Sequence, residues 1–534
     1  MSLLGKEELQ RIYERSLSFL CGDDREKIVA ALHANTGQRE LPEILQQKAG
    51  EIDMPEFLPD LARLEAVFRN AFHQKIVLSE EITYPALNPT VYLLELSWKG
   101  LVSLLLHQEG DLPQPEKGRQ FVLVWVHAGT EEVRMRPASD EDLLLLKMVV
   151  EEIKPEEIAL MGNIPVDNIY AAMDRAAAEG ILLSLPSLLR RNSAAFNRHG
   201  QALEQFMSPS IMTLQWHVTQ SCDLHCKHCY DRSERSSMTL EDGIKILDDF
   251  QVFCRERRVR GQISFSGGNP LLYPKFTELY RAAVERGFVT AILGNPSTRQ
   301  QIEELIAIQM PSFFQVSLEG LQEHNDNIRG KGHFERVIAF LSILRELKVY
   351  SMVMLTLTKD NVDQVIPLAA GLRDRTNTFN FNRLAMVGEG SNLRLPSKEQ
   401  YEAFLKDYLK AADENPVMGI KDNLINILHQ QQEVDFFGGC TGFGCGAAFN
   451  FLSILSDGEV HACRKFPSPI GNILKQGIAA VYDSAVAIRY REGSSACSEC
   501  SIRPVCGGCL AVTHGHGLDV FIEKDPYCFI NTKS

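Results

Sequence analysis

The sequence has no stretch long and apolar enough to cross a membrane. Across its 534 residues, nowhere do eighteen uncharged apolar residues follow one another, whereas a spanning helix needs about 20. The first residues, MSLLGKEELQRIYERS, are charged and lack the apolar core of a secretory signal. Low-complexity tracts and internal repeats are missing as well. We therefore expect a globular protein of the cytoplasm with no membrane partner.

Positive charge is also in short supply. The 55 Lys and Arg residues stand against 69 Asp and Glu residues, which gives a net charge of −14. Binding to a phosphate backbone needs a basic surface, so we expect no nucleic-acid partner. The basic run from Arg255 to Arg260 is interpreted as the solvated end of a helix. Single cores rarely exceed about 300 residues, so the chain is expected to hold several domains.

Cysteine, by contrast, is abundant and unevenly placed. Disulfides are rare where thiols are kept reduced, so 13 cysteines in a cytoplasmic chain favour metal or cluster binding. Cys21 and Cys254 stand alone, and we expect them to be small buried apolar residues. The others form two groups, three near residue 225 and eight between residues 440 and 528.

The N-terminal third of the chain predicts two modules. Residues 1–118 are expected to form a mostly helical region for partner or substrate docking, with an amphipathic helix over 54–72 and a strand over 90–98. Residues 119–186 predict a hairpin and three helices, a winged-helix arrangement. Its expected elements are 120–126, 131–137, 140–153, 155–162 and 166–183. Residues 187–209 are interpreted as a linker.

This second module resembles the precursor-peptide recognition element of ribosomal peptide maturation systems. In those systems a leader peptide adds a strand to the edge of the sheet. A winged helix that only packs against the next domain is the alternative. DNA binding is disfavoured, because the third helix carries acidic side chains against Arg175 alone, namely Asp167, Asp174 and Glu179.

Strands and helices alternate regularly between residues 210 and 390. Six segments are expected to be strands: 214–220, 262–268, 289–295, 313–320, 350–358 and 379–386. The alternation predicts an α/β fold with a parallel sheet built from right-handed crossovers. Six such units close only part of a TIM-like barrel, a partial (β/α)6 barrel. Chemistry is then expected at the C-terminal ends of the strands.

The first cysteine group lies directly after the first of these strands. Cys222, Cys226 and Cys229 follow a C-x3-C-x2-C spacing. Three thiolates on one loop leave a cubane iron–sulfur cluster one iron short of full ligation, unlike the four-cysteine sets of electron-transfer clusters. Zinc, with His225 or His228 as a fourth ligand, is the alternative. The loop follows an α/β strand and does not belong to a small finger, which favours the cluster.

The motif, followed by the aromatic Tyr230, resembles that of the radical S-adenosylmethionine (SAM) superfamily. The resemblance implies that SAM chelates the open iron and is split to a 5'-deoxyadenosyl radical that abstracts hydrogen. It also implies cofactor contacts at the strand ends: the backbone of Tyr230 for adenine, Gly267, Gly268 and Asn269 for the ammonium, Ser317 and Glu319 for the ribose hydroxyls and ammonium, and Arg329 for the carboxylate. Asn269 replaces the usual glutamate and lacks its charge.

The second cysteine group, within residues 391–534, predicts two further clusters. Eight cysteines suffice for two fully ligated four-iron clusters; paired zinc ribbons are the alternative, although the gap between Cys500 and Cys506 is short for them. The spacing resembles the SPASM extension of peptide-modifying radical SAM enzymes, with two residues instead of three before Cys509. The resemblance implies one cluster on Cys440, Cys445, Cys463 and Cys509 and another on Cys497, Cys500, Cys506 and Cys528. His514 and His516 are interpreted as solvent-facing.

These features together predict a radical SAM peptide maturase with three [4Fe-4S] clusters. It would oxidise or cross-link a residue, with cysteine as the expected target, of a ribosomally made precursor peptide, and take electrons from a flavodoxin- or ferredoxin-type reductant. The sequence looks most like the thio(seleno)oxazole modification maturase subgroup. A formylglycine-forming anaerobic sulfatase maturase is one alternative, disfavoured because Arg464 stands where those enzymes have an aspartate base. A non-catalytic iron–sulfur carrier or scaffold is the other. No residue is assigned as catalytic base.

Overall fold

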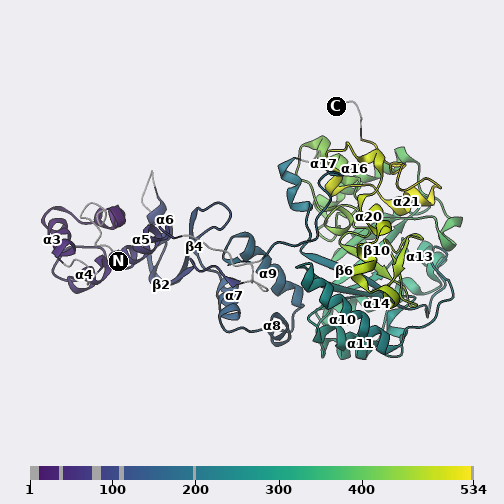
Figure 1. The fold of residues 1–534 in the computed structure, drawn as a ribbon, viewed down its shortest axis with the longest axis horizontal. Helices are drawn as coiled ribbons and strands as arrows, with labels where there is room; N and C mark the ends of the chain where they lie inside the picture. The colour runs from purple at the N-terminus through teal and green to yellow at the C-terminus, as the bar shows by residue number, and fades with distance from the viewer. Residues whose placement is uncertain are drawn as a thin grey trace. The chain divides into compact units, whose positions relative to one another are not determined.

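The structure is a computed structural model that describes residues 11–34, 40–74, 86–107, 114–183, 185–196 and 200–530 (Figure 1). The chain divides into two compact units. Unit 1 comprises residues 1–158 and 168–185, and unit 2 comprises residues 159–167 and 186–534. Among the described residues, no helix is both long enough and apolar enough to cross a lipid bilayer.

Unit 1 combines short helices with a small antiparallel sheet. Its strands are β1 (Ala86–Leu87), β2 (Tyr92–Lys99), β3 (Glu116–Val126), β4 (Val133–Pro137) and β5 (Leu182–Leu183). Its helices are α2 (Glu14–Leu17), α3 (Gly22–Ala34), α4 (Leu41–Gln47), α5 (Leu58–Ala71), α6 (Leu101–Leu106) and α7 (Asp140–Val150). Helices α8 (Pro155–Gly162) and α9 (Val166–Ala178) cross the division between the units.

The predicted hairpin is present as β3 and β4, but β3 has a second partner. The sheet order is β2-β3-β4, and Leu94 of β2 lies opposite Val122 of β3. The expected boundary between residues 118 and 119 therefore falls inside β3. Leu61 and Leu64 of α5 share one buried cluster with Leu94 and Val122. The helical region and the hairpin are thus built on a common core.

The helix expected over 166–183 ends earlier, at Ala178. Gly180 has a φ of 78°, and the N–H of Ile181 donates to the carbonyl of Ala176 at 2.9 Å. A left-handed glycine with such a bond stops a helix. The apolar residues that follow, β5, pair with β1 instead of extending the helix. Their helical spacing hid a turn and a short strand.

Unit 2 contains the predicted α/β alternation. Its strands are β6 (Ile211–Thr219), β7 (Arg260–Gly267), β8 (Val289–Leu293), β9 (Phe314–Ser317), β10 (Ser351–Leu357), β11 (Thr378–Arg383), β12 (Phe451–Ile454), β13 (Glu459–His461) and β14 (Pro469–Asn472). Its helices are α10 (Leu240–Glu256), α11 (Phe276–Glu285), α12 (Arg299–Ile306), α13 (Gln322–Arg329), α14 (His333–Glu346), α15 (Val365–Gly371), α16 (Lys398–Glu414), α17 (Ile425–Gln432), α18 (Ile473–Gln476), α19 (Ile478–Tyr482), α20 (Ala485–Glu492) and α21 (Leu510–Gly515).

All six expected strands of the partial barrel are confirmed, and they pair in parallel in chain order from β6 to β11. The sheet does not stop there. Strand β12 joins the free edge of β6 in parallel, and β13 and β14 continue antiparallel, which makes nine strands. The expected boundary between residues 390 and 391 separates segments that share this sheet. Sequence reasoning did not anticipate the extension.

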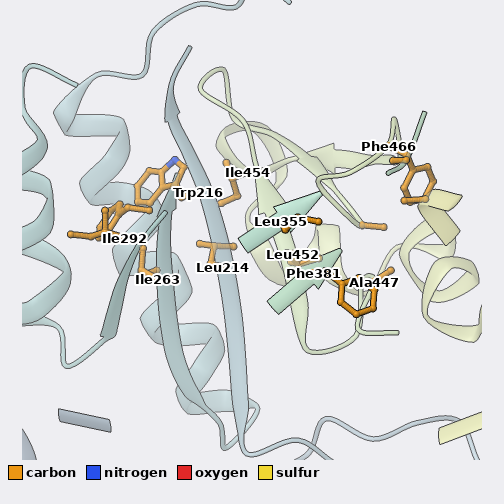
Figure 2. Packing of buried hydrophobic residues seen from close by; sticks show 14 of the residues in the cluster. Leu214, Trp216, Ile263, Ile292, Leu355, Phe381, Ala447, Leu452, Ile454 and Phe466 are labelled. Carbon is orange, nitrogen blue, oxygen red and sulfur yellow. The ribbon is translucent and has the colours of Figure 1, made fainter. Parts of the chain in front are cut away.

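Strand β6 lies within the hydrophobic core of unit 2, and Figure 2 shows Leu214 and Trp216 of this strand among other residues of that core. Trp216 is fully buried and stacks on Phe265 of β7 with ring centroids 6.2 Å apart. On the opposite edge, Trp216 lies beside Ile454 of β12 and Leu214 beside Leu452. Strand β6 is therefore fixed from both sides, and the loop that follows it starts from a rigid position.

The segment 187–209, expected to be a linker, is folded onto unit 2. Leu189 and Leu203 belong to its core cluster, and Met207 is buried. The N–H of Arg191 donates to the carbonyl of Met207 at 2.9 Å. The apolar side chains of this segment therefore pack against the core of unit 2, and the segment is not an extended linker.

Candidate functional site

A cavity of about 870 Å³ lies at the C-terminal ends of the parallel strands. Polar side chains of β6, β7 and β9 face it, including His217, Ser266 and Ser317. The position agrees with the expectation for a barrel of this kind. Both cysteine groups contribute to its lining: Cys222, Cys226, Cys229, Cys440, Cys445, Cys463 and Cys509.

The first cysteine loop follows β6 directly. Cys222 is exposed, whereas Cys226 and Cys229 are partly buried, and all three are free thiols. Burial is the main cause that raises the pKa of Cys226; Arg329 opposes it, and the neighbouring Cys222 and Cys229 add to it. The three thiols are thus close enough to interact electrostatically at one end of the cavity.

Two glycines at the end of β7 fix the start of this loop. Gly267 has a φ of 147°, and the N–H of Gly268 donates to the carbonyl of Thr219 at 2.9 Å. A Cβ on Gly268 would lie 2.2 Å from the carbonyl oxygen of Ser221. Only a residue without a side chain allows this approach. Both glycines line the cavity.

Asn269, which replaces the usual glutamate, is 5% exposed and is held by protein groups. Its Oδ1 accepts from the N–H of Leu271 at 3.3 Å, and its Nδ2 donates to Oδ1 of Asp223 at 3.1 Å. Asn295, just after β8, donates to the same Asp223 oxygen at 2.6 Å. Asp223, inside the cysteine loop, therefore supplies a carboxylate beside the amide. Sequence reasoning did not single it out.

Glu319 and Arg329 form a buried ion pair. Arg329 donates from Nε and Nη2 to Oε1 of Glu319 at 2.8 and 2.6 Å, and its Nη1 lies 3.7 Å from Sγ of Cys226. The other oxygen of Glu319 accepts from the N–H of Thr356 at 2.8 Å. Of these two residues, Arg329 lines the cavity and Glu319 does not. Glu319 thus orients Arg329 beside the cysteine loop.

A second buried network joins the two cysteine groups. Arg464, 6% exposed, donates to Oδ2 of Asp231 at 2.6 Å and to Nε2 of His217 at 2.9 Å. Its guanidinium lies 4.5 Å from the centre of the Tyr230 ring. Tyr230 follows Cys229 and Arg464 follows Cys463, so this contact clamps the two loops together.

The same network holds His217 in its neutral form. Burial, followed by the charge of Arg464, lowers the pKa of His217 well below its usual range. The hydroxyl of Tyr230 lies 3.1 Å from its Nε2. Sequence reasoning missed His217, although the alternation of Gln215, His217 and Thr219 along β6 placed it on one face of the strand.

The eight C-terminal cysteines separate into two sets of four in space. Cys440, Cys445, Cys463 and Cys509 line the large cavity, and Cys497, Cys500, Cys506 and Cys528 line a separate pocket of about 30 Å³. Burial raises the pKa of Cys445 to about 11, and Cys509 and Cys440 add to the effect. Burial also raises the pKa of Cys506, with further contributions from Cys500, Cys497 and Cys528. These are the two sets that the SPASM resemblance implies.

The loop of Cys509 is tied to the barrel by a buried carboxylate. Oδ2 of Asp525 accepts from the N–H of Cys509 at 2.8 Å, and both Asp525 oxygens bind Arg383 at 2.9 and 2.7 Å. Arg383, the last residue of β11, also binds Asp422 at 2.8 Å. His514 and His516 are exposed.

The donor chemistry fits iron–sulfur clusters. Within the described part of the chain, no three His, Cys, Asp or Glu side chains are placed to hold one metal ion. Eleven of the cysteines gather instead as one set of three and two sets of four, and all 13 are free of disulfides. Thiolates in such sets are the ligands of cubane clusters.

Two family models match the chain. The radical SAM superfamily model matches residues 216–370, and the iron–sulfur cluster-binding SPASM model matches residues 445–509. The chain carries a radical SAM domain and a SPASM domain. The radical SAM match includes the cysteine triad, the glycine pair and the Glu319–Arg329 pair, and the two domains imply SAM and iron–sulfur clusters as cofactors. Neither model reaches residues 1–185.

The matches to curated relatives cover most of each relative's own length. The AdoMet-dependent heme synthase of Methanosarcina barkeri is 26% identical over 354 residues, which are 60% of this chain and 97% of that protein. The mycofactocin maturase MftC of Mycolicibacterium smegmatis is 29% identical over 339 residues, 59% of this chain and 82% of that protein. The subtilosin biosynthesis protein AlbA of Bacillus subtilis is 23% identical over 320 residues, which are 56% of this chain and 67% of that protein.

Among solved structures, Streptococcus suis SuiB bound to precursor peptide SuiA matches with a TM-score of 0.49 and 16% identity. The match covers 77% of this chain and 96% of SuiB.

Gly268→Ala should displace the cysteine loop of the radical SAM domain. The new Cβ would collide with the backbone oxygen of Ser221, so we expect reconstituted protein to lose about four irons while its α/β fold is retained. Iron analysis with circular dichroism checks this. Gly371→Ala is the matched control, because a Cβ there has no atom within 4 Å. Full iron content in Gly268→Ala would contradict the prediction.

Glu319→Gln should lower stability in a pH-dependent way. Burial raises the pKa of Glu319, but His228 and Arg329 lower it by more than burial raises it. The pKa of Glu319 therefore lies well below its usual range. Such a carboxylate stabilises the fold above its unfolded pKa of about 4.3, and this stabilisation is lost as the pH falls through the folded pKa. We expect a loss of about 3 to 5 kcal/mol at pH 7.

Urea unfolding of the wild type and Glu319→Gln at several pH values between 7 and 4 measures this difference. It should begin to narrow as the pH approaches 4. The exposed Glu323→Gln on α13 is the control and should change little. A pH-independent difference would show that Glu319 is not held ionised.

Proposed function

We propose that the protein cleaves SAM at an initiating cluster held by Cys222, Cys226 and Cys229 and oxidises or cross-links a residue of a ribosomally made precursor peptide. The observation that carries this proposal is the shared cavity: the triad and four cysteines of the second group line the same volume of about 870 Å³. A residue bound there can lose a hydrogen atom on one side and an electron on the other.

The cofactor contacts follow from the residues around the triad. When bound, SAM supplies the 5'-deoxyadenosyl radical. Arg329 presents its charge beside Cys226 for the methionine carboxylate, with Glu319 as its positioning residue. Gly267, Gly268 and Asn269 border the ammonium position, where Asp223 supplies the negative charge that Asn269 lacks. Ser317 is assigned to the ribose hydroxyls and the backbone of Tyr230 to adenine.

We further propose two fully ligated auxiliary clusters, three clusters in all. Cys440, Cys445, Cys463 and Cys509 hold the first, and Cys497, Cys500, Cys506 and Cys528 hold the second. Full ligation favours electron transfer over substrate binding. A flavodoxin- or ferredoxin-type reductant provides the electron for SAM cleavage. The protein acts in the cytoplasm, in keeping with its 13 free thiols.

A peptide substrate is supported by the relatives and by unit 1. A mycofactocin maturase and a subtilosin biosynthesis protein are among the relatives. The heme synthase relative suggests a different substrate, but 97% of that protein is matched by 60% of this chain, which leaves two fifths of this chain without a counterpart in it. In unit 1, β4 pairs only with β3 among the described strands. Its outer edge is where a leader peptide would add as a strand.

Formylglycine formation is the less favoured alternative. Arg464 follows Cys463, and its guanidinium is bound to Asp231 and His217. A guanidinium only donates hydrogen bonds and cannot accept the substrate proton. Asp231 is paired with this cation and is not available as a replacement base.

Anaerobically reconstituted protein should bind about twelve irons and form 5'-deoxyadenosine when reduced with SAM. Cys222→Ala should lose about four irons and all 5'-deoxyadenosine. Cys21→Ala is the matched control, since Cys21 stands alone in sequence and is exposed, contrary to the expectation that it is buried. Iron analysis and chromatography of the nucleoside measure both quantities. Full turnover by Cys222→Ala would rule out the radical function.

Removal of residues 1–185 should abolish peptide modification while uncoupled SAM cleavage persists within about twofold. The cut removes unit 1 together with residues 159–167 of unit 2. The residues that line the cavity begin at Thr213, so the cavity is spared. Mass spectrometry of a leader-containing peptide and assay of 5'-deoxyadenosine separate the two activities, and a scrambled leader with the full chain is the control. Unchanged peptide modification would show that unit 1 does not recognise the substrate.

A further inference from the structure

Two arginines lie buried beside the auxiliary cysteines without a carboxylate partner. Arg191 is 5% exposed and Arg503 is 6% exposed. Among the described residues, the side-chain hydrogen bonds of both go to backbone carbonyls alone. Neither lies in the network around Arg464, and neither contacts the cofactor residues of the barrel.

Arg191 reaches the backbone of the first auxiliary set. Its Nη2 donates to the carbonyl of Cys445 at 2.7 Å and to that of Phe443 at 2.8 Å, and its Nη1 donates to the carbonyl of Arg491 at 2.7 Å. The guanidinium lies 3.9 Å from the centre of the Phe449 ring. Its Nε is buried and has no hydrogen-bond partner among the described residues. Arg191 comes from the segment that the sequence presents as a linker.

Arg503 takes the corresponding place beside the second set. Its backbone N–H donates to the carbonyl of Cys500 at 3.2 Å. Its guanidinium donates to the carbonyls of Ala195 and Glu492. The ring of Phe196 lies 4.5 Å from Arg503 and 4.9 Å from Arg191. The segment of Arg191 and Phe196 therefore contacts both auxiliary regions.

A guanidinium buried in this way needs a nearby anion, because its removal from water is costly. The charges that favour ionised Arg191 include Cys445, and those that favour ionised Arg503 are Cys497 and Cys500, followed by the more distant carboxylate of Glu492. Thiolates bound to a cluster carry the missing negative charge.

We propose that Arg191 and Arg503 set the reduction potentials of the two auxiliary clusters. The inference rests on the proposed function. A fixed positive charge stabilises the reduced, more negative cluster and raises its potential. Arg191 acts on the set of Cys445 and Arg503 on the set of Cys497. Each cluster is thereby better able to accept the electron left on the substrate.

The test uses the full chain with Cys222, Cys226 and Cys229 all changed to Ala, so that the auxiliary clusters alone titrate. Potentials are measured by redox titration with electron paramagnetic resonance. Arg191→Gln keeps two hydrogen-bond donors but no charge. It should lower the potential of one auxiliary cluster by about 59 mV, which is a tenfold change in the reduced-to-oxidised ratio of a one-electron couple. Arg503→Gln should lower the other potential. In Arg191→Lys, the reduced-to-oxidised ratio of that cluster should stay within threefold of the ratio in the parent protein.

The matched control is Arg489→Gln. Arg489 is exposed on α20, and its guanidinium lies 3.9 Å from the centre of the Phe521 ring, so solvent screens its charge. It should leave both potentials unchanged.

Iron analysis accompanies each titration and separates the possible failures. A parent protein without auxiliary iron would refute the proposed function itself. Normal iron with unchanged potentials in both Gln variants would overturn the inference alone. Loss of iron in Arg191→Gln and Arg191→Lys alike would assign Arg191 to folding and would also overturn it.

Discussion

The parallel pairing of β12 with β6 is the constraint on which the site depends. Phe451–Ile454 runs beside Thr213–Trp216, so the residues before and after β12 lie next to the strand that leads into Cys222. Cys440 and Cys445 precede this short strand, and Cys463 follows it. One sheet thus brings two cysteine groups, more than 200 residues apart in sequence, to a common cavity. Backbone hydrogen bonds, independent of any metal, set their mutual position.

Buried ion pairs then refine that arrangement. Arg464 with Asp231 joins the loop of Cys229 to that of Cys463, and Arg383 with Asp525 joins β11 to the loop of Cys509. Such pairs contribute little net stability, because desolvation offsets their attraction, but breaking one is costly. They therefore act as registration contacts that favour one placement of the cysteine loops. Arg191 and Arg503 differ from these pairs, because in the proposed arrangement the negative charge beside them comes from the clusters.

The sequence was informative where a signal repeats or where chemistry restricts residue choice. The six barrel strands carry repeated strand–helix alternation, and the cysteine sets have distinctive spacings. It was uninformative where the decisive contact joins distant segments. Strands β12 to β14 span four residues or fewer each, too few for a period-two pattern to stand out. The engagement of Asn269 by Asp223 and the role of Arg191 depend on tertiary contacts. The helical spacing that continues past Gly180 likewise concealed the short strand β5, since periodicity carries no information about a left-handed φ.

The position of β6 between β7 and β12 also limits how such a protein can be rearranged. A SPASM region removed at the apparent boundary after residue 390 would take β12 with it and expose the full edge of β6, a strand whose side chains are largely buried. Unpaired edges of this kind recruit other strands and promote aggregation. The barrel and its C-terminal extension are therefore expected to be inherited, exchanged and engineered as one piece, whereas unit 1 can vary independently of them.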